Sequence, residues 1–383
     1  MNRLVCSLVG SLLMGSVSNA QEIPDPLAVL GDDRTAEAWN SKGRAATLKI
    51  FSEQVYGVTP DTKISTEWKL DRESEALNGK AIRREYLLTF AGKLTARVLV
   101  YAPKGKTSAP AFMGLNFDGN HTLEKDPWIT ENGKGKRGQF AGRWCVDQVI
   151  ANGTGLVTIH CADFDPDEHD GFKNGLHPLF PGERDGKTWG SFGVWAWGLS
   201  RVLDHLASVP EIDEKRIAVI GFSRMGKTAL WAGAQDERFA MVVSNNSGCG
   251  GAALSKRRHG EKVDRITKVF PHWFCGNFAK FSDKEDEMPF DQHQLFACIA
   301  PRPVYVASAS KDDWADPEGE FLSLVHAAPV YELFEKDAFD GGEWPKAGGA
   351  TGGKLLRYHI RDGKHDIKAW DWERYLAASN DWL

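Results

Sequence analysis

Runs of apolar residues alternate along the chain with segments whose apolar positions recur every three or four residues. The runs predict strands at 85–90, 95–103, 109–117, 155–161, 216–222, 239–246, 303–309 and 355–360. Several of them are apolar at nearly every position, which is typical of parallel strands covered on both faces. The periodic segments between them, such as 192–208 and 226–235, predict helices. This alternation indicates a three-layer α/β fold with a mostly parallel central sheet and helices on both faces.

The first twenty residues have the pattern of an export signal. Arg3 precedes an apolar run, and small residues lead to Ala20, so we expect a signal peptide at 1–20 and a secreted or periplasmic protein. The run is too short to cross a bilayer, and no later segment is long and apolar enough to do so. Residues 21–383 show no internal repeat and no clear linker, so we expect one domain, acting as a monomer. The glycine-rich segment 340–354 is expected to be a loop.

Composition narrows the class of partner. The chain of 383 residues is 42% hydrophobic and 26% charged, which suits a large buried core. Its net charge of -5 shows no excess of basic residues of the kind that binds nucleic acid, so nucleic acid is not expected as a partner. The fourteen tryptophans are expected both to fill the core and to offer faces that stack on sugar rings or aromatic ligands.

Export permits disulfide bonds, but the odd number of cysteines means that at least one thiol is unpaired. Of the six cysteines Cys6 lies in the predicted signal peptide, and an odd number remains: Cys145, Cys161, Cys249, Cys275 and Cys298. The pair Cys249 and Cys275 is the first candidate for a disulfide. The others are interpreted as small buried hydrophobic residues, because their spacing matches no zinc site.

Ser223 lies where a strand, a sharp turn and a helix follow one another, in "RIAVIGFSRMGKTALWAG" (216–233). A nucleophile elbow usually reads G-x-S-x-G, and it exposes the serine hydroxyl at the carboxyl end of the sheet. Gly221 fits the first glycine. The second arrives one place late, at Gly226. The strand before Ser223 and the small residues after it nevertheless favour an elbow with Ser223 as nucleophile.

A serine nucleophile needs a base and an acid that orients the base. In the α/β-hydrolase order the acid follows the nucleophile and the histidine comes last. His365, in the loop after the last predicted strand, is the candidate base, whereas His359 inside that strand is interpreted as structural. Asp312 is the candidate acid and Asp313 its rival. Asp316, just before a proline, is expected to form a turn or a helix cap.

Two other polar segments need a prediction. The segment 160–171 is rich in carboxylates but lacks the glycine at the sixth position of an EF-hand loop, so we expect a polar loop and no metal. The segment 116–122 follows a strand that often supplies an oxyanion amide and is expected to line the cleft. No cofactor is expected.

Longer stretches resemble a known family, the bacterial glucuronoyl esterases of carbohydrate esterase family 15, which are α/β-hydrolases. The resemblance covers roughly residues 85–383 and includes the late glycine, because the family's nucleophile stands in G-x-S-R-x-G-K. It is carried by "KTWGSFGVWAWGLSR", "GFSRMGKTALWAGAQDERFAMVVSNNSGCGGAALS", "GEKVDRI", "FPHWFC", "APRPVYVASASKDDWADPEGEF" and "YHIRDGKHD". It implies cofactor-free hydrolysis of esters between 4-O-methyl-glucuronic acid on xylan and lignin alcohols, so the implied partner is a carbohydrate ester.

The resemblance also implies individual roles. Ser223 and His365 match the family's nucleophile and base, and Arg224 matches an arginine that supports the oxyanion. A guanidinium beside the acyl carbon would stabilise the charge that develops there. Three residues match contacts to the sugar: Lys227, Glu261 and Trp314.

One position departs from the family. Many members place the acid in a segment like "ESG" after the strand that follows the nucleophile, but this chain has "NNSG", with Asn246 at that place. An amide can orient an imidazole but cannot stabilise its positive charge. We therefore expect the acid on the later loop, at Asp312. Two alternatives stay open: an acetyl xylan esterase that shares these residues, and an inactive carbohydrate-binding relative.

Overall fold

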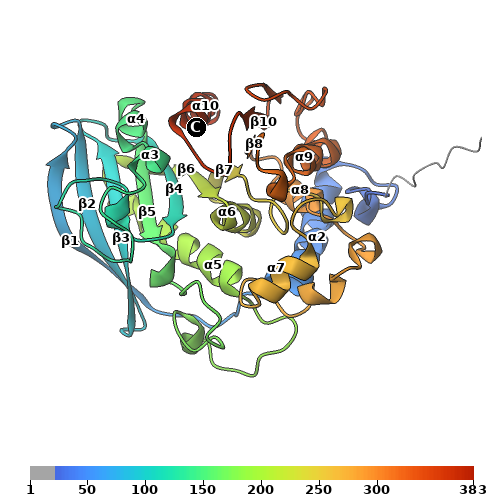
Figure 1. Cartoon of the computed structure of the whole chain (residues 1–383), viewed down its shortest axis with the longest axis horizontal. Helices are drawn as coiled ribbons and strands as arrows, with labels where there is room; N and C mark the ends of the chain where they lie inside the picture. Colours follow the sequence, from blue (N-terminus) through green and yellow to red (C-terminus); the bar gives the residue numbers. More distant parts are fainter. Residues whose placement is uncertain (1–21) are drawn as a thin grey trace, which may run out of the picture.

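A single sheet of ten strands, with helices packed on both of its faces, forms the centre of the molecule (Figure 1). The structure is a computed structural model that describes residues 22–383, so the predicted signal peptide lies outside the described residues. The strands are β1 (Thr66–Ala76), β2 (Ala81–Phe90), β3 (Leu94–Pro103), β4 (Ala109–Asn116), β5 (Gly155–His160), β6 (Ile212–Phe222), β7 (Phe239–Asn245), β8 (Val304–Ala309), β9 (Ala350–Gly352) and β10 (Leu356–Arg361).

Parallel strands occupy the middle of the sheet and antiparallel strands its edges. The spatial order is β1-β2-β3-β5-β4-β6-β7-β8-β10-β9. From β5 to β10 each neighbouring pair is parallel, whereas β1, β2, β3 and β9 pair antiparallel. Because parallel strands end at the same edge, the loops after β4, β5, β6, β7, β8 and β10 gather there. That edge is where ligands bind in open α/β sheets.

The helices form two layers of unequal size. Residues of α5, α6, α8 and α9 share the larger apolar core with one face of the sheet, and residues of α4 and α10 share the smaller core with the other face (Figure 1). The helices are α1 (Ala36–Ala38), α2 (Arg44–Phe51), α3 (Ala141–Trp144), α4 (Val146–Ala151), α5 (Ser191–Leu203), α6 (Arg224–Gln235), α7 (Val263–Val269), α8 (His293–Ala297), α9 (Pro317–Tyr331) and α10 (Ala369–Trp382).

Every strand predicted from the apolar runs is present, and so are both named helices. The α/β fold with helices on both faces is therefore confirmed. The pattern missed two strands. β1 is an edge strand whose alternate residues are exposed and charged, so it contains no apolar run. β9 is a three-residue strand inside the glycine-rich segment that was expected to be a loop.

The candidate disulfide was wrong. Cys145, Cys161, Cys249, Cys275 and Cys298 are all free thiols. Cys249 and Cys275 are both buried, and the Cys275 sulfur lies 3.8 Å from the carbonyl oxygen of Glu53 rather than beside another sulfur. Within residues 22–383 no helix combines the length and apolarity that a membrane crossing requires.

Candidate active site

Ser223 occupies a strained turn between β6 and α6. Its backbone has φ 59° and ψ -129°, a conformation that residues with a Cβ atom rarely adopt. A Cβ atom on Gly221 would lie only 1.8 Å from the carbonyl oxygen of Met225, so only glycine fits there. The Ser223 amide donates to the Asn245 carbonyl oxygen at 2.8 Å, which joins the turn to the end of β7. The turn has the geometry of a nucleophile elbow.

The late glycine of the elbow serves the packing of α6. A Cβ atom on Gly226 would lie 2.8 Å from Cβ of Ser247 and 3.0 Å from Oγ of Ser244. Further along the helix, a Cβ on Gly233 would meet Val242 at 2.3 Å. The small residues of this segment therefore let α6 approach β7 closely.

His365 and Asp312 meet at the carboxyl edge of the sheet. Ala309, the last residue of β8, lies beside Arg361, the last of β10, so the two following loops begin at the same level. A hydrogen bond of 2.6 Å joins His365 Nδ1 to Asp312 Oδ2. The Asp312 side chain is only 5% exposed, whereas that of His365 is 42% exposed. A buried carboxylate thus holds one nitrogen of a ring that is open to solvent.

The neighbouring acidic residues point elsewhere. The Asp313 side chain is 89% exposed, and its Oδ1 lies 2.8 Å from Nε2 of His259. Asp316 caps α9, because its side chain accepts from the Gly319 amide at 3.0 Å, as expected. His359 is fully buried and bonded to Tyr305 and Asp371, which agrees with a structural interpretation.

Asn246 contacts the same carboxylate as His365. Its Nδ2 donates to Asp312 Oδ2 at 2.8 Å, and its backbone has φ 48°, in the left-handed region that asparagine tolerates. Its Oδ1 atom is buried and has no partner among the described residues. The amide at the family's alternative acid position therefore supports Asp312 directly.

One cavity of about 300 Å³ brings together all seven residues that were given a catalytic or substrate-binding role, whereas segment 116–122, which was expected to line the cleft, contributes no residue to its lining. Part of its wall is formed by the elbow, the residues at the end of β7, and the loops after β8 and β10. It is lined by Ser223, Arg224, Lys227, Asn246, Ser247, Gly248, Glu261, Phe270, Trp273, Asp312, Trp314, Ala315 and His365.

Lys227 is buried in the wall of this cavity, with its ammonium group held by the backbone. Nζ donates to the carbonyl oxygens of Ser247 and Cys249, the latter at 2.7 Å, and lies 3.9 Å from Oε2 of Glu261. Burial lowers the pKa of Lys227, and the charge of Glu261 opposes that shift. An ammonium has three N–H groups, so one remains for a ligand.

Aromatic side chains form the other walls. Trp314 is 54% exposed, and its carbonyl oxygen accepts from the Glu261 amide at 2.9 Å, so these two residues are fixed to each other. Phe270 and Trp273 stack face to face, with ring centroids 3.7 Å apart. Sequence reasoning assigned no role to Phe270 and Trp273, although both lie in the segment "FPHWFC" that carries the family resemblance.

Sequence reasoning also missed two carboxylates behind the cavity. Asp167, in the carboxylate-rich loop after β5, forms an ion pair with Arg224. Glu320 of α9 accepts from the amides of Ser247 at 2.6 Å and Gly248 at 2.9 Å. Burial raises the pKa of Glu320 to about 8. Asp167 could have been sought in the polar loop, whereas Glu320 carries no signal beyond its place in a helix.

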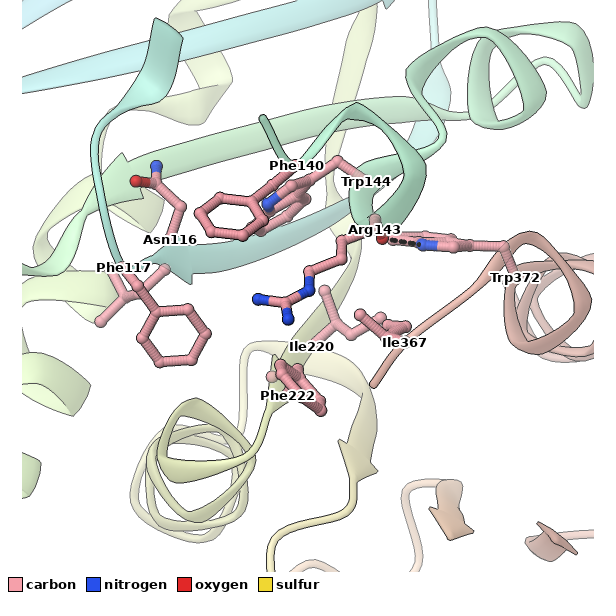
Figure 2. Close-up of a pocket in the computed structure, with 11 residues that line it drawn as sticks. Asn116, Phe117, Phe140, Arg143, Trp144, Ile220, Phe222, Ile367 and Trp372 are labelled. Carbon is pink, nitrogen blue, oxygen red and sulfur yellow. Dashed lines mark hydrogen bonds between the residues drawn. The ribbon is translucent and has the colours of Figure 1, made fainter. Parts of the chain in front are cut away.

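A second, apolar pocket lies behind the elbow, where Arg143 extends between the rings of Phe140 and Phe222 (Figure 2). Its volume of about 30 Å³ admits a water molecule but no sugar ring. Arg143 Nε donates to Asp366 at 2.7 Å, and the Phe222 ring lies 4.7 Å from that of His365. This pocket therefore supports the His365 loop rather than a substrate. No cluster suited to a metal ion occurs within residues 22–383.

Comparison with known proteins gives consistent matches. A sequence model described as "Glucuronyl esterase, fungi" matches residues 146–335. Carbohydrate esterase MZ0003, from an unknown prokaryotic organism, is 42% identical, with 94% of this chain and 89% of that protein covered.

Solved structures agree with these matches over almost the whole chain. A glucuronoyl esterase from Solibacter usitatus is 38% identical with a TM-score of 0.89, covering 95% of this chain and 98% of its own. A promiscuous CE15 esterase from a marine bacterial metagenome is 40% identical with a TM-score of 0.87, covering 94% and 97%.

Proposed function

This chain belongs to the glucuronoyl esterases of carbohydrate esterase family 15 and is a carboxylic ester hydrolase, and on that premise we propose that it cleaves esters of (4-O-methyl-)glucuronic acid, as in lignin–glucuronoxylan cross-links. The proposal rests above all on one observation. A serine at a strained elbow and a histidine paired with a buried aspartate line the same cavity as a buried lysine, a glutamate and an exposed tryptophan.

The first step is attack by Ser223 on the C6 carbonyl of the ester. His365 takes the hydroxyl proton through Nε2, because Nδ1 is held by Asp312. The carboxylate fixes the imidazole tautomer and stabilises the imidazolium that forms. The alcohol then leaves with the proton from His365. Water hydrolyses the glucuronoyl-enzyme by the same route, so neither a metal nor a cofactor enters the scheme.

The oxyanion is stabilised at the start of α6. The backbone amide of the residue after the nucleophile commonly contributes to an oxyanion hole, and here that residue is Arg224. Its guanidinium adds a positive charge at the same cavity wall. Donors that are fixed before the reaction stabilise the transition state without reorganisation.

The sugar ring is recognised on the other side of the cavity. The free N–H of Lys227 and the carboxylate of Glu261 supply a donor and an acceptor for ring hydroxyls. The exposed face of Trp314 is available for stacking on the ring. The acyl group of an acetyl ester carries no hydroxyls for these groups, whereas the acyl group of a glucuronate ester is itself a sugar ring, so their presence favours a uronate over an acetyl substrate.

The test is hydrolysis of benzyl glucuronate by the wild-type protein and by Ser223→Ala. We expect turnover by the former and none by the latter, with an unchanged fold by circular dichroism. Turnover by Ser223→Ala would refute the assignment of the nucleophile. A wild type that cleaves acetylated xylan but not benzyl glucuronate would identify an acetyl esterase. Failure of a fluorophosphonate to label Ser223 would point to a non-catalytic carbohydrate-binding protein.

A further inference from the structure

Asp167 accepts from three donors, which come from two separate parts of the chain. Its Oδ1 accepts from His272 Nε2 at 3.0 Å and from Trp273 Nε1 at 2.6 Å, and its Oδ2 pairs with Nη1 of Arg224. The Asp167 side chain is largely buried. Burial alone would favour the neutral acid, but the bonds from His272, Arg224 and Trp273 hold the pKa of Asp167 below its ordinary value. The carboxylate is therefore ionised, and both of its oxygens are held by donors.

Arg224 depends on this carboxylate for its direction. Among the described residues, Asp167 is the hydrogen-bond partner of its guanidinium, and its buried Nε has no partner. The guanidinium carbon lies 4.9 Å from the centroid of a Trp273 ring and 5.4 Å from that of Phe117. Aromatic faces attract a cation but leave it free to rotate. The ion pair supplies the directional contact.

We propose that Asp167 is a positioning residue that holds Arg224 and the indole of Trp273 in the geometry needed for oxyanion stabilisation. The role rests on the proposed function, in which Arg224 faces the developing charge. The ion pair engages Nη1 and leaves the N–H groups of Nη2 for the oxyanion. The same carboxylate fixes Trp273, which also lines the cavity. One carboxylate therefore holds both a charged and an aromatic side chain of the cavity wall.

A carboxylate here also has an electrostatic cost, because its charge offsets part of the positive potential of Arg224. That cost is compensated only if orientation matters more than net charge, as it does for donors that must point at the oxyanion before it forms. A purely structural Asp167 would instead influence stability and leave the chemical step unchanged.

The variant Asp167→Asn keeps the contact with Trp273 and removes the ion pair with Arg224. The amide oxygen still accepts from Trp273, but the amide nitrogen is a donor and cannot pair with Arg224. We expect kcat for benzyl glucuronate to fall about tenfold to a hundredfold, with KM changed less than about threefold, because a small misplacement of a catalytic group carries a cost of this order. An unchanged kcat would overturn the proposal.

Glu168→Gln is the matched control, since Glu168 is the next residue in the loop and is exposed. It is expected to keep wild-type kcat. A double-mutant cycle shows whether Asp167 acts through Arg224. In an Arg224→Met background, Asp167→Asn is expected to change kcat by less than about twofold. Losses that multiply in the double variant would overturn the proposal.

Two further measurements keep the test decisive. If Asp167→Asn does not fold, Trp273→Phe removes one of the donors to the same carboxylate, and an unchanged kcat there would overturn the proposal. The rate of Ser223 labelling by a fluorophosphonate reports oxyanion stabilisation whatever the acyl group. A wild type that is labelled rapidly but cannot cleave a uronate ester, with labelling slowed in Asp167→Asn, would refute the uronate specificity and support the positioning role.

Discussion

His365 Nδ1 lies 2.6 Å from Asp312 Oδ2, although 53 residues separate the two in the chain. Both residues stand in loops that leave neighbouring parallel strands at the same level. The loops are joined further by a bond of 2.8 Å from the Lys311 amide to the Gly363 carbonyl oxygen. The pair is therefore held by backbone as well as by side chains, and its geometry is available before any substrate binds.

Replacing the buried carboxylate is expected to impair turnover severely. In Asp312→Asn the amide can no longer stabilise the imidazolium and favours the wrong tautomer, so kcat should fall by about 10³–10⁴-fold. The measurement is steady-state hydrolysis of benzyl glucuronate. Asp313→Asn is the control, because that side chain is exposed and directed at His259. A larger loss in Asp313→Asn than in Asp312→Asn would show that the wrong neighbour has been chosen.

Asn246 offers a test based on pH. In Asn246→Asp a second carboxylate would stand where an amide now donates to Asp312 at 2.8 Å. Two carboxylates at such a distance cannot both ionise readily, so the pKa of one of them rises. We expect the acid limb of the pH profile of kcat/KM to move to higher pH. Asn246→Gly, which keeps the left-handed backbone and adds no charge, should leave that limb in place; equal profiles for all three proteins would contradict the prediction.

Lys227 is expected to act on the sugar rather than on the chemical step. Lys227→Met removes the free N–H, and the loss of a hydrogen bond to a charged group should raise KM for a uronate ester about tenfold to a hundredfold. Hydrolysis of 4-nitrophenyl acetate, which has no sugar, should change little. Lys256→Met is a matched control, since Lys256 is also buried and donates to a backbone carbonyl, that of Asp286. A similar rise in KM in both variants would indicate general loosening instead.

Glu320 makes the stability of the protein depend on pH. Its pKa is about 8 in the folded protein, against an ordinary value of 4.5, so the folded state binds more protons between these values. The free energy of unfolding attributable to this group therefore falls as pH rises from about 4.5 to 8. Glu320→Gln resembles the protonated acid and should lose less of its melting temperature between pH 5 and 8 than the wild type. Parallel melting curves across this range would refute the prediction.

Local sequence was sufficient for most of the strands and for the elbow. The apolar runs identified the strands because strands buried on both faces need apolar side chains at nearly every position. Gly221 and the strand before Ser223 marked the turn, and the structure shows that a Cβ atom at Gly221 or at Gly226 would collide with a neighbour. β1 escaped detection since an edge strand with one exposed face contains charged residues instead of an apolar run.

Contacts between distant loops were beyond the reach of the sequence. Asp312 and Asp313 are adjacent and chemically identical, so the sequence could only rank them. The pairing of β8 with β10, and the turn that begins at Asp313, direct the first toward His365 and the second toward solvent. The pairing of Cys249 with Cys275 was wrong for a related reason, because spacing along the chain says nothing about the partners that surround each thiol.

The sequence by itself thus determined which apolar segments become strands, which periodic segments become helices α5 and α6, where the candidate nucleophile stands, and the order in which the other candidate catalytic groups follow it. Only the tertiary structure decided which carboxylate faces the histidine, that Asn246 supports it, and that Asp167 holds Arg224. The physical reason is the distance along the chain over which the determining interactions act. Secondary structure depends on periodicity and propensity over a few residues, whereas the site depends on side-chain directions fixed by the packing of loops far apart in the chain.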